Sequence, residues 1–234
     1  MAISKTQSVT GAGATLVLNS VASGSILVFQ ESYFRNPTTG AAPATPTDSN
    51  GTFVLLTADA PQGDGTSDVG TAIWFEKNAA SGTHTVTPAT INAHDSVLTE
   101  FLWTGIDPAT VAVDVATSAE TASGTQTSQV TGTTGATANA EELALISFAM
   151  AATTTGNSNV GLTDPVTNYT TLSTGGNDAT DIAFMHSWRA LSATGTQSAT
   201  FNWTFSESDQ YCMACIGVLK ATALVSSPLL NMVF

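Results

Sequence analysis

The sequence contains very little positive charge. Its 234 residues include five Lys and Arg against 18 Asp and Glu, which gives a formal net charge of −13. A nucleic-acid-binding protein needs a basic surface that contacts phosphates, and a protein that binds anionic membranes needs a similar surface. We therefore expect neither nucleic acid nor a membrane among its partners, and we predict a neutral to acidic surface.

Other features are scarce as well. Charged residues of both signs make up 10% of the chain, which is too few for the surface of a long helical protein, and the 42% hydrophobic content excludes a charged disordered chain. No apolar run reaches the roughly 18 residues of a transmembrane helix. The first residues, Met1 to Gln7, lack the apolar segment of a signal peptide. If the protein leaves the cell, we expect it to do so by a route other than ordinary secretion.

The chain has two cysteines, Cys212 and Cys215. They lie in a predicted strand, where residues three positions apart face opposite sides. This spacing disfavours a disulfide between them, and no second pair of ligands with the spacing of a zinc site accompanies them. We predict that both are buried structural thiols.

Short runs of β-branched and aromatic residues, separated by Gly, Pro, Asn and Asp, recur along the chain and predict an all-β fold. Residues 201–205 alternate between rings and polar side chains, as in a strand with one buried face. Residues 26–29 and 143–146 are apolar at every position and predict central strands that are covered on both faces. The predicted architecture is a two-sheet antiparallel sandwich of the jelly-roll type.

The order of strands and turns occurs twice, about 110 residues apart, which predicts an internal repeat. In this alignment His84 corresponds to Gln197. The matched segments are 25–30 with 142–147, 47–53 with 163–169, 72–83 with 183–196, and 95–98 with 209–212.

We interpret residues 1–220 as one sandwich domain built from two related halves, about 20–117 and 138–220, each of which contributes strands to both sheets. The alternative is a pair of tandem sandwiches joined by the polar segment 118–139.

A C-terminal extension, residues 221–234, is strongly apolar and follows the last predicted strand. Because a free apolar segment promotes aggregation, we expect it either to pack along its own domain or to dock on a neighbouring subunit or partner. The candidate contact residues are Leu224, Val225, Leu229, Leu230, Met232, Val233 and Phe234.

Motifs that carry chemistry are largely missing. The chain has no nucleophile elbow and no phosphate-binding loop, and its three histidines are predicted to lie on the surface or half-buried. One loop places Asp59, Asp64 and Asp68 close together, which makes a weak candidate for Ca²⁺ binding, although we interpret this loop as a solvated hairpin tip. We predict no catalytic residues, no cofactor and no enzyme activity.

Four tryptophans are the candidates for stacking on a ligand. Trp74 and Trp203 lie in alternating strands with other rings and are predicted to be core residues. Trp103 and Trp188 lie near turns, where an exposed ring stacks on a sugar.

One stretch resembles a known module. Trp74, Asn78, Gly82 and the pair Thr85-Val86 follow the pattern W-x-x-x-N-x-x-x-G-x-x-T-V. A second motif, E-[FY]-x-G-[IVL], is represented by Glu100-Phe101 and Gly105-Ile106, with Leu-Trp-Thr between the two pairs. The stretch from about Ser25 to Lys220 thereby resembles a β-sandwich module of tailed-phage virion proteins.

The resemblance implies a non-enzymatic structural protein of a phage particle, such as a homo-oligomeric capsid decoration protein on the virion surface. Its expected partners are the major capsid or tail protein and copies of itself, after assembly in the host cytoplasm. The alternative is a carbohydrate-binding or host-adhesion module, similar to a tail fibre, whose partner is a host glycan. A glycan-cleaving enzyme with carboxylates from distant strands is a third hypothesis.

Overall fold

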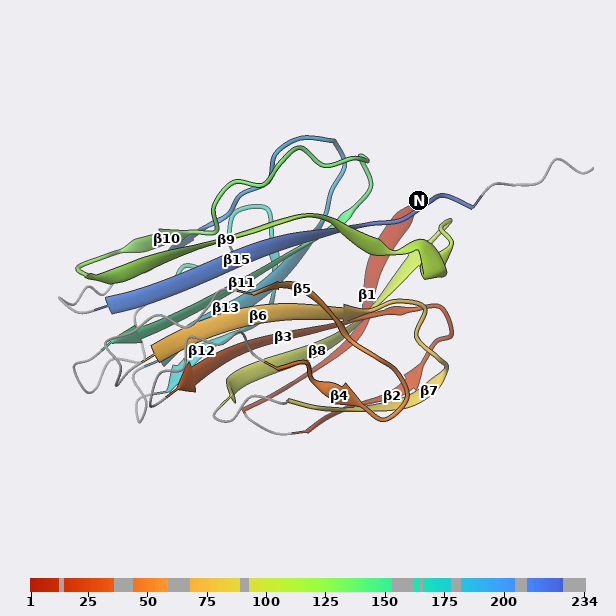
Figure 1. Ribbon diagram of the computed structural model, residues 1–234, viewed down its shortest axis with the longest axis horizontal. Helices are drawn as coiled ribbons and strands as arrows, with labels where there is room; N and C mark the ends of the chain where they lie inside the picture. Colours follow the sequence, from red (N-terminus) through yellow and green to blue (C-terminus); the bar gives the residue numbers. More distant parts are fainter. Residues whose placement is uncertain are drawn as a thin grey trace, which may run out of the picture.

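The computed structural model describes residues 1–12, 15–35, 44–58, 68–88, 93–152, 162–164, 166–177, 182–204 and 210–224 (Figure 1). Antiparallel sheets pack against one another, which confirms the predicted all-β sandwich. A 3-10 turn at Pro108–Thr110 is the only helical element among these residues. In the described part of the chain no helix is long and apolar enough to cross a membrane.

The first half of the chain forms one large sheet and one small sheet. The large sheet has the strand order β1-β8-β3-β6-β5, and the small sheet has the order β2-β7-β4. Their bounds are β1 Ala2–Gly11, β2 Leu16–Val21, β3 Ile26–Arg35, β4 Thr47–Asp48, β5 Val54–Ala58, β6 Asp68–Glu76, β7 Gly82–Thr87 and β8 Ala93–Thr104.

The second half also forms one large sheet and one small sheet. Its large sheet has the order β12-β13-β11-β15-β9, and β10 pairs with β14. The bounds are β9 Ala112–Gly124, β10 Ser128–Val130, β11 Leu143–Ala152, β12 Thr170–Asn177, β13 Ile182–Ala190, β14 Thr200–Asn202 and β15 Gln210–Lys220.

The two large sheets have equivalent strand orders. When β8, β3 and β6 are aligned with β15, β11 and β13, the edge strands β1 and β5 correspond to β9 and β12. This is the arrangement that a duplicated unit would produce, and the duplication itself stays a prediction. The central strands β3 and β11 each pair with strands of their own half, whereas β9 begins within the predicted first half and pairs with β15 of the second, so the division into two halves stays a prediction.

Four apolar clusters hold the layers together, and the smallest joins Val69 of β6 to residues of β11 and β15. Another lies between the two large sheets and includes Ile26, Val28 and Leu145. The other two lie between each large sheet and the small sheet that covers its outer face. Burial of one such side chain stabilises the fold by roughly 1.5–3 kcal/mol.

The central strands are apolar at every position because both of their faces are covered. In β3, Ile26 and Val28 belong to the cluster between the large sheets, whereas Leu27 and Phe29 belong to the outer cluster of the first half. The same alternation along β11 explains the apolar run 143–146. The prediction of two central strands is therefore confirmed.

The cysteines of β15 follow the same alternation. Cys212 faces the outer cluster of the second half, and Cys215 faces the cluster between the large sheets. Both are buried and neither forms a disulfide, as predicted. Burial raises the pKa of the Cys212 thiol to about 12, so this thiol is protonated at neutral pH.

The W-x-x-x-N-x-x-x-G motif has a structural explanation. Trp74 is a core residue of β6, as predicted, and the turn that follows places Asn78 at φ 53° and Gly82 at φ 127°. Asn tolerates the left-handed region better than most residues, and Gly adopts positive φ without a steric penalty. The motif thus specifies the turn between β6 and β7.

Candidate functional site

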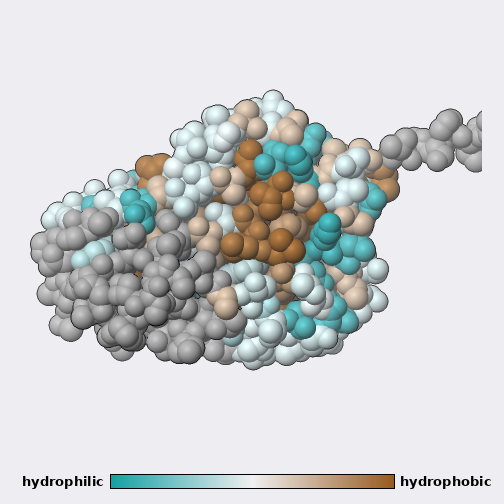
Figure 2. All heavy atoms as spheres, viewed as in Figure 1, coloured by the Kyte–Doolittle hydropathy of each residue, from teal (hydrophilic) through white to brown (hydrophobic). Residues whose placement is uncertain are grey.

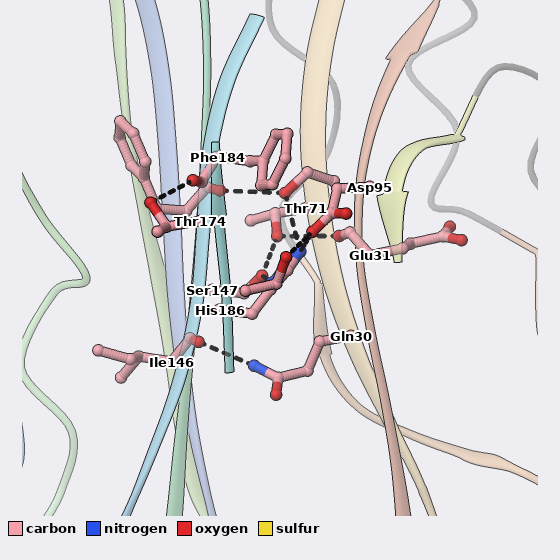
Figure 3. A network of polar contacts seen from close by, with 12 residues as sticks. Gln30, Glu31, Thr71, Asp95, Ile146, Ser147, Thr174, Phe184 and His186 are labelled. Atoms are coloured by element: carbon pink, nitrogen blue, oxygen red, sulfur yellow. Dashed lines mark hydrogen bonds and ion pairs between the residues drawn. The ribbon is translucent and has the colours of Figure 1, made fainter. Parts of the chain in front are cut away.

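A layer of polar side chains lies between the two large sheets (Figure 3). At its centre the imidazole of His186 on β13 lies with Nδ1 2.6 Å from Ser147 Oγ on β11. On the other side of the ring, Nε2 lies 3.4 Å from Ser32 Oγ on β3 and 3.6 Å from Asp95 Oδ2 on β8. Strands from both halves therefore contribute to one polar network.

The same layer links the sheets through side chains of the first half. Ser32 Oγ donates to the carbonyl oxygen of Phe148 at 3.0 Å, and Gln30 Nε2 donates to that of Ile146 at 2.8 Å. These bonds join the side chains of β3 to the backbone of β11 across the interface. Because apolar contacts are not directional, such hydrogen bonds fix how the two sheets align.

Burial determines the charges in this network. It lowers the pKa of His186 to about 3, so the imidazole is neutral at neutral pH. Burial also raises the pKa of Asp95 to about 7, although hydrogen bonds from Ser173 and the Ser96 backbone act in the opposite direction. Ser173 Oγ donates to Asp95 Oδ2 at 2.7 Å.

Ser147, His186 and Asp95 are the residue types of a nucleophilic triad, but their environment does not suit catalysis. Ser147 and His186 are fully buried and Asp95 is 6% exposed. The Ser147 hydroxyl is already engaged by Thr71 as well as by the imidazole. A substrate has no access to a nucleophile in this position. The network therefore has the properties of a structural linkage between the sheets.

A second polar cluster lies between the large and small sheets of the first half. It consists of Asp48 on β4, Glu76 on β6 and His84 on β7, whose ligand-type atoms lie within 4.8 Å of one another. His84 Nδ1 is 2.5 Å from Asp48 Oδ2, and His84 Nε2 is 2.9 Å from the carbonyl oxygen of Ala80. The side chains of Asp48 and His84 are fully buried, and Glu76 is 5% exposed.

The ionisation of this cluster is strongly perturbed. Burial, followed by repulsion from Asp48, raises the pKa of Glu76 to about 7. Burial lowers the pKa of His84, but the Ala80 carbonyl and the two carboxylates outweigh it, so this pKa lies above its ordinary value. One buried imidazole thus faces two carboxyl groups.

Sequence reasoning missed both clusters. The prediction that His84 and His186 lie on the surface or half-buried is wrong, because both strands are covered on the faces that carry these rings. The side chain of His94 lies outside the described residues. The residues converge from separate strands, and their spacing carries no motif. The Thr-Asp loop that contains Asp48 was visible only as part of the sequence repeat.

Many predicted site residues lie outside the described structure. This applies to Asp59 and Asp64, to the side chain of Asp68, and to the segment 225–234 with Val225, Leu229, Leu230, Met232, Val233 and Phe234. The calcium site and the tail contacts therefore stay predictions. Leu224 is 62% exposed, and its backbone N–H donates to the carbonyl oxygen of Gly105 at 3.0 Å.

The two tryptophans proposed for stacking lie near the cluster between the large sheets. Trp103 is 5% exposed and belongs to that cluster, so almost none of its ring is accessible. Trp188 is half-buried and packs edge-on against Phe101, with ring centroids 5.0 Å apart. Stacking of Trp188 on a sugar stays a prediction.

The surface carries several shallow grooves. One of about 760 Å³ lies between the start of β1 and the segments 138–141 and 190–194, and another of about 420 Å³ surrounds Arg189 and Gln197. A third, of about 270 Å³, also borders Arg189. Among the described residues that line these three grooves, Glu141 and Arg189 are the only side chains with a charge. Glu141 forms an ion pair with the amino group of Met1, at 2.9 Å.

Apolar residues gather on one face, where β5 lies against β9 and β15 (Figure 2). Val54 and Leu55 of β5 are 51% and 42% exposed, and Val113 of β9 is 37% exposed. We call Val54, Leu55 and Val113 the apolar patch. Both β5 and β9 are edge strands of their sheets.

These features define the chain as an antiparallel β-sandwich protein with two buried polar clusters and an exposed apolar patch. No protein-family model, no curated protein and no solved structure matches it.

Proposed function

We propose that this protein is a non-enzymatic structural component of a phage particle, a capsid decoration or accessory protein on the virion surface. We further propose that the apolar segment 225–234 of one copy docks on the apolar patch of the next. The observation that carries the proposal is the exposed apolar patch, which lies on two edge strands. Ser147, His186 and Asp95, the residues that resemble a catalytic triad, are buried. The phage assignment rests on the sequence resemblance of residues 72–107.

Edge strands favour this kind of contact. Their outer N–H and C=O groups have no partner within the sheet, so they accept an added strand from another segment. Val54, Leu55 and Val113 then supply an apolar surface for the side chains of that segment. An exposed apolar surface beside an open edge is typical of an interaction site.

Charge also favours the segment 225–234 as the occupant. Two copies with a formal net charge of −13 each repel one another, so their contacts must form where charge is absent. The ten residues that follow Leu224 include no charged residue and carry five large apolar side chains besides Val225. Fully extended, ten residues span at most about 33–36 Å.

The experiment is co-sedimentation with phage particles from cultures of the host that carries the gene. We expect the parent chain in the particle fraction. The double variant Val54→Ser and Leu55→Ser should lose most of this association, because the patch becomes polar. Val130→Ser is the matched control, since Val130 is 43% exposed but lies on β10, in the outer small sheet of the second half. Absence of the parent chain from the particles would contradict the proposal.

A further inference from the structure

We propose that Asp48, Glu76 and His84 form a binding site for one divalent transition-metal ion, with Zn²⁺ as the ion to test. This inference is independent of the phage assignment. It rests on the contacts of the three side chains and on the polar atom that they leave without a partner.

The fold brings three suitable ligands to one buried point. Asp48, Glu76 and His84 come from β4, β6 and β7, and their ligand atoms lie within 4.8 Å of one another. Two ligand atoms bonded to one Zn²⁺ at about 2.0–2.2 Å lie at most about 4.4 Å apart. In a tetrahedral site such atoms lie about 3.3–3.6 Å apart, so the three side chains would have to move to surround one ion.

The imidazole is oriented as a metal ligand. A carbonyl oxygen only accepts hydrogen bonds, so the bond with Ala80 places a proton on His84 Nε2. Nδ1 therefore faces Asp48 Oδ2 at 2.5 Å, which is a hydrogen-bond distance, and a metal ion bound by both atoms would replace the shared proton and move the two atoms apart. Metal-bound histidines commonly donate their second ring N–H to a backbone carbonyl in this way.

Glu76 supplies a separate observation. Its Oε2 atom is buried and has no hydrogen-bond partner, although the residue is only 5% exposed. The neighbouring Glu100 pairs with the same residue of β3, Leu27, and receives hydrogen bonds from Ser25, Ala22, Thr6 and Gln7. The Glu76 carboxyl group also has hydrogen bonds with Asp48 and the Thr52 backbone, so Oε2 is the oxygen that stays available to a ligand.

The backbone around Glu76 is adapted to hold its carboxylate. A Cβ atom at Gly51 would overlap the carboxylate oxygens of Glu76, so a larger residue at this position would displace that carboxylate. The segment between β4 and β5 thus passes directly over the carboxylate and closes the cluster on that side.

The second half shows what replaces the cluster at the equivalent place. Glu76 pairs with Leu27 on β3, and Arg189 pairs with Ala144 on β11, which the sequence repeat aligns with Leu27. Arg189 Nη2 donates to Gln197 Oε1 at 2.5 Å, and Gln197 is the counterpart of His84. By strand register the second half therefore places a cation where the first half places Glu76, although the predicted repeat aligns Glu76 with Ser187.

The ligand set determines the class of ion. Ca²⁺ takes six to eight oxygen atoms, and Mg²⁺ keeps most of its water molecules, so neither suits a buried site with an imidazole. One imidazole nitrogen and two carboxylates suit Zn²⁺ and its first-row neighbours. A water molecule or the second oxygen of Glu76 would complete a tetrahedral set.

The test is a calorimetric titration of the chelator-treated full chain with ZnCl₂. We expect one saturable site per chain and a rise in Tm when Zn²⁺ is bound, because the ion binds only the folded state. Glu76→Gln and His84→Gln should weaken the affinity by at least about tenfold. Glu141→Gln is the matched control, because it removes the same charge from an exposed carboxylate and should bind Zn²⁺ as the parent does.

Three outcomes would overturn the proposal. The parent chain shows no saturable Zn²⁺ site, Glu76→Gln binds as tightly as Glu141→Gln, or CaCl₂ saturates the site while ZnCl₂ does not. The first would mean that a proton alone occupies the cluster. If a variant fails to fold, a Co²⁺ titration of the parent decides, since a buried imidazole–carboxylate site produces visible absorption that Zn²⁺ removes. Lack of that absorption would equally contradict the proposal.

Discussion

At the scale of the single residue, the position of Asp95 between the sheets determines its pKa. Its carboxyl group lies 3.6 Å from the His186 ring and accepts a hydrogen bond from Ser173. Burial raises its pKa from an ordinary value of 3.8 to about 7. The folded protein therefore holds a proton on Asp95 at a pH where the unfolded chain has already lost it.

This difference predicts the pH dependence of the Asp95→Asn variant. The stability that Asp95 contributes is fully present below about pH 4 and is lost as the pH rises through about 7. Asn does not ionise, so the variant should gain stability relative to the parent between pH 5 and pH 8, by an amount on the order of a few kcal/mol. Urea unfolding of both proteins at the two pH values measures this. The effect of His186 on the pH dependence is present in both proteins, so it largely cancels in the comparison. The same stability difference between variant and parent at pH 5 and pH 8 would contradict the prediction.

At the scale of the element, strand β5 joins the two halves on one side of the molecule. Leu56 of β5 is buried against β15, where residue 217 is a glycine. A Cβ atom at this glycine would overlap the Cγ atom of Leu56. The absence of a side chain at position 217 therefore allows β5 to lie close to the second sheet.

Gly217→Ala should consequently destabilise the protein, by about 1–3 kcal/mol, because the added methyl group displaces a buried leucine. The measurement is the free energy of unfolding in urea. Gly124→Ala is the control, since its nearest neighbouring atom lies 4.0 Å from the added carbon and this change should be close to neutral. Equal stabilities of the two variants would show that β5 is not held in this way.

The strands themselves were well predicted from the sequence. The apolar runs at β3 and β11 have the pattern of central strands, and the alternation around Trp203 places that ring in the core as expected. These features depend on residues that are close in the chain. The position of Leu56 over Gly217 depends on how two sheets pack, which no local pattern encodes.

The buried clusters were missed for the same reason. Asp48 and His84 are 36 residues apart, and Ser147 and His186 are 39 residues apart. Each residue taken alone has an ordinary setting in a strand or turn. Only the pairing of β4 with β7, and of β11 with β13, brings them within hydrogen-bonding distance.

At the scale of the whole molecule, two features favour apolar contacts between copies. Positive charge is scarce, and the polar clusters are buried. Five Lys and Arg residues give few opportunities for salt bridges between copies. Ser147 and His186 are inside the molecule, while Val54, Leu55 and Val113 are outside. Contacts between copies are therefore expected to use apolar side chains and strand edges.

Sedimentation velocity over a range of protein concentrations tests this most directly. We expect the parent chain to form a defined oligomer, and both the chain 1–224 and the Val54→Ser, Leu55→Ser variant to be monomeric. Val130→Ser should behave as the parent does, because its exposed valine lies outside the apolar patch. A parent chain that stays monomeric at every concentration, or a patch variant that assembles as the parent does, would contradict assembly through segment 225–234 and the apolar patch.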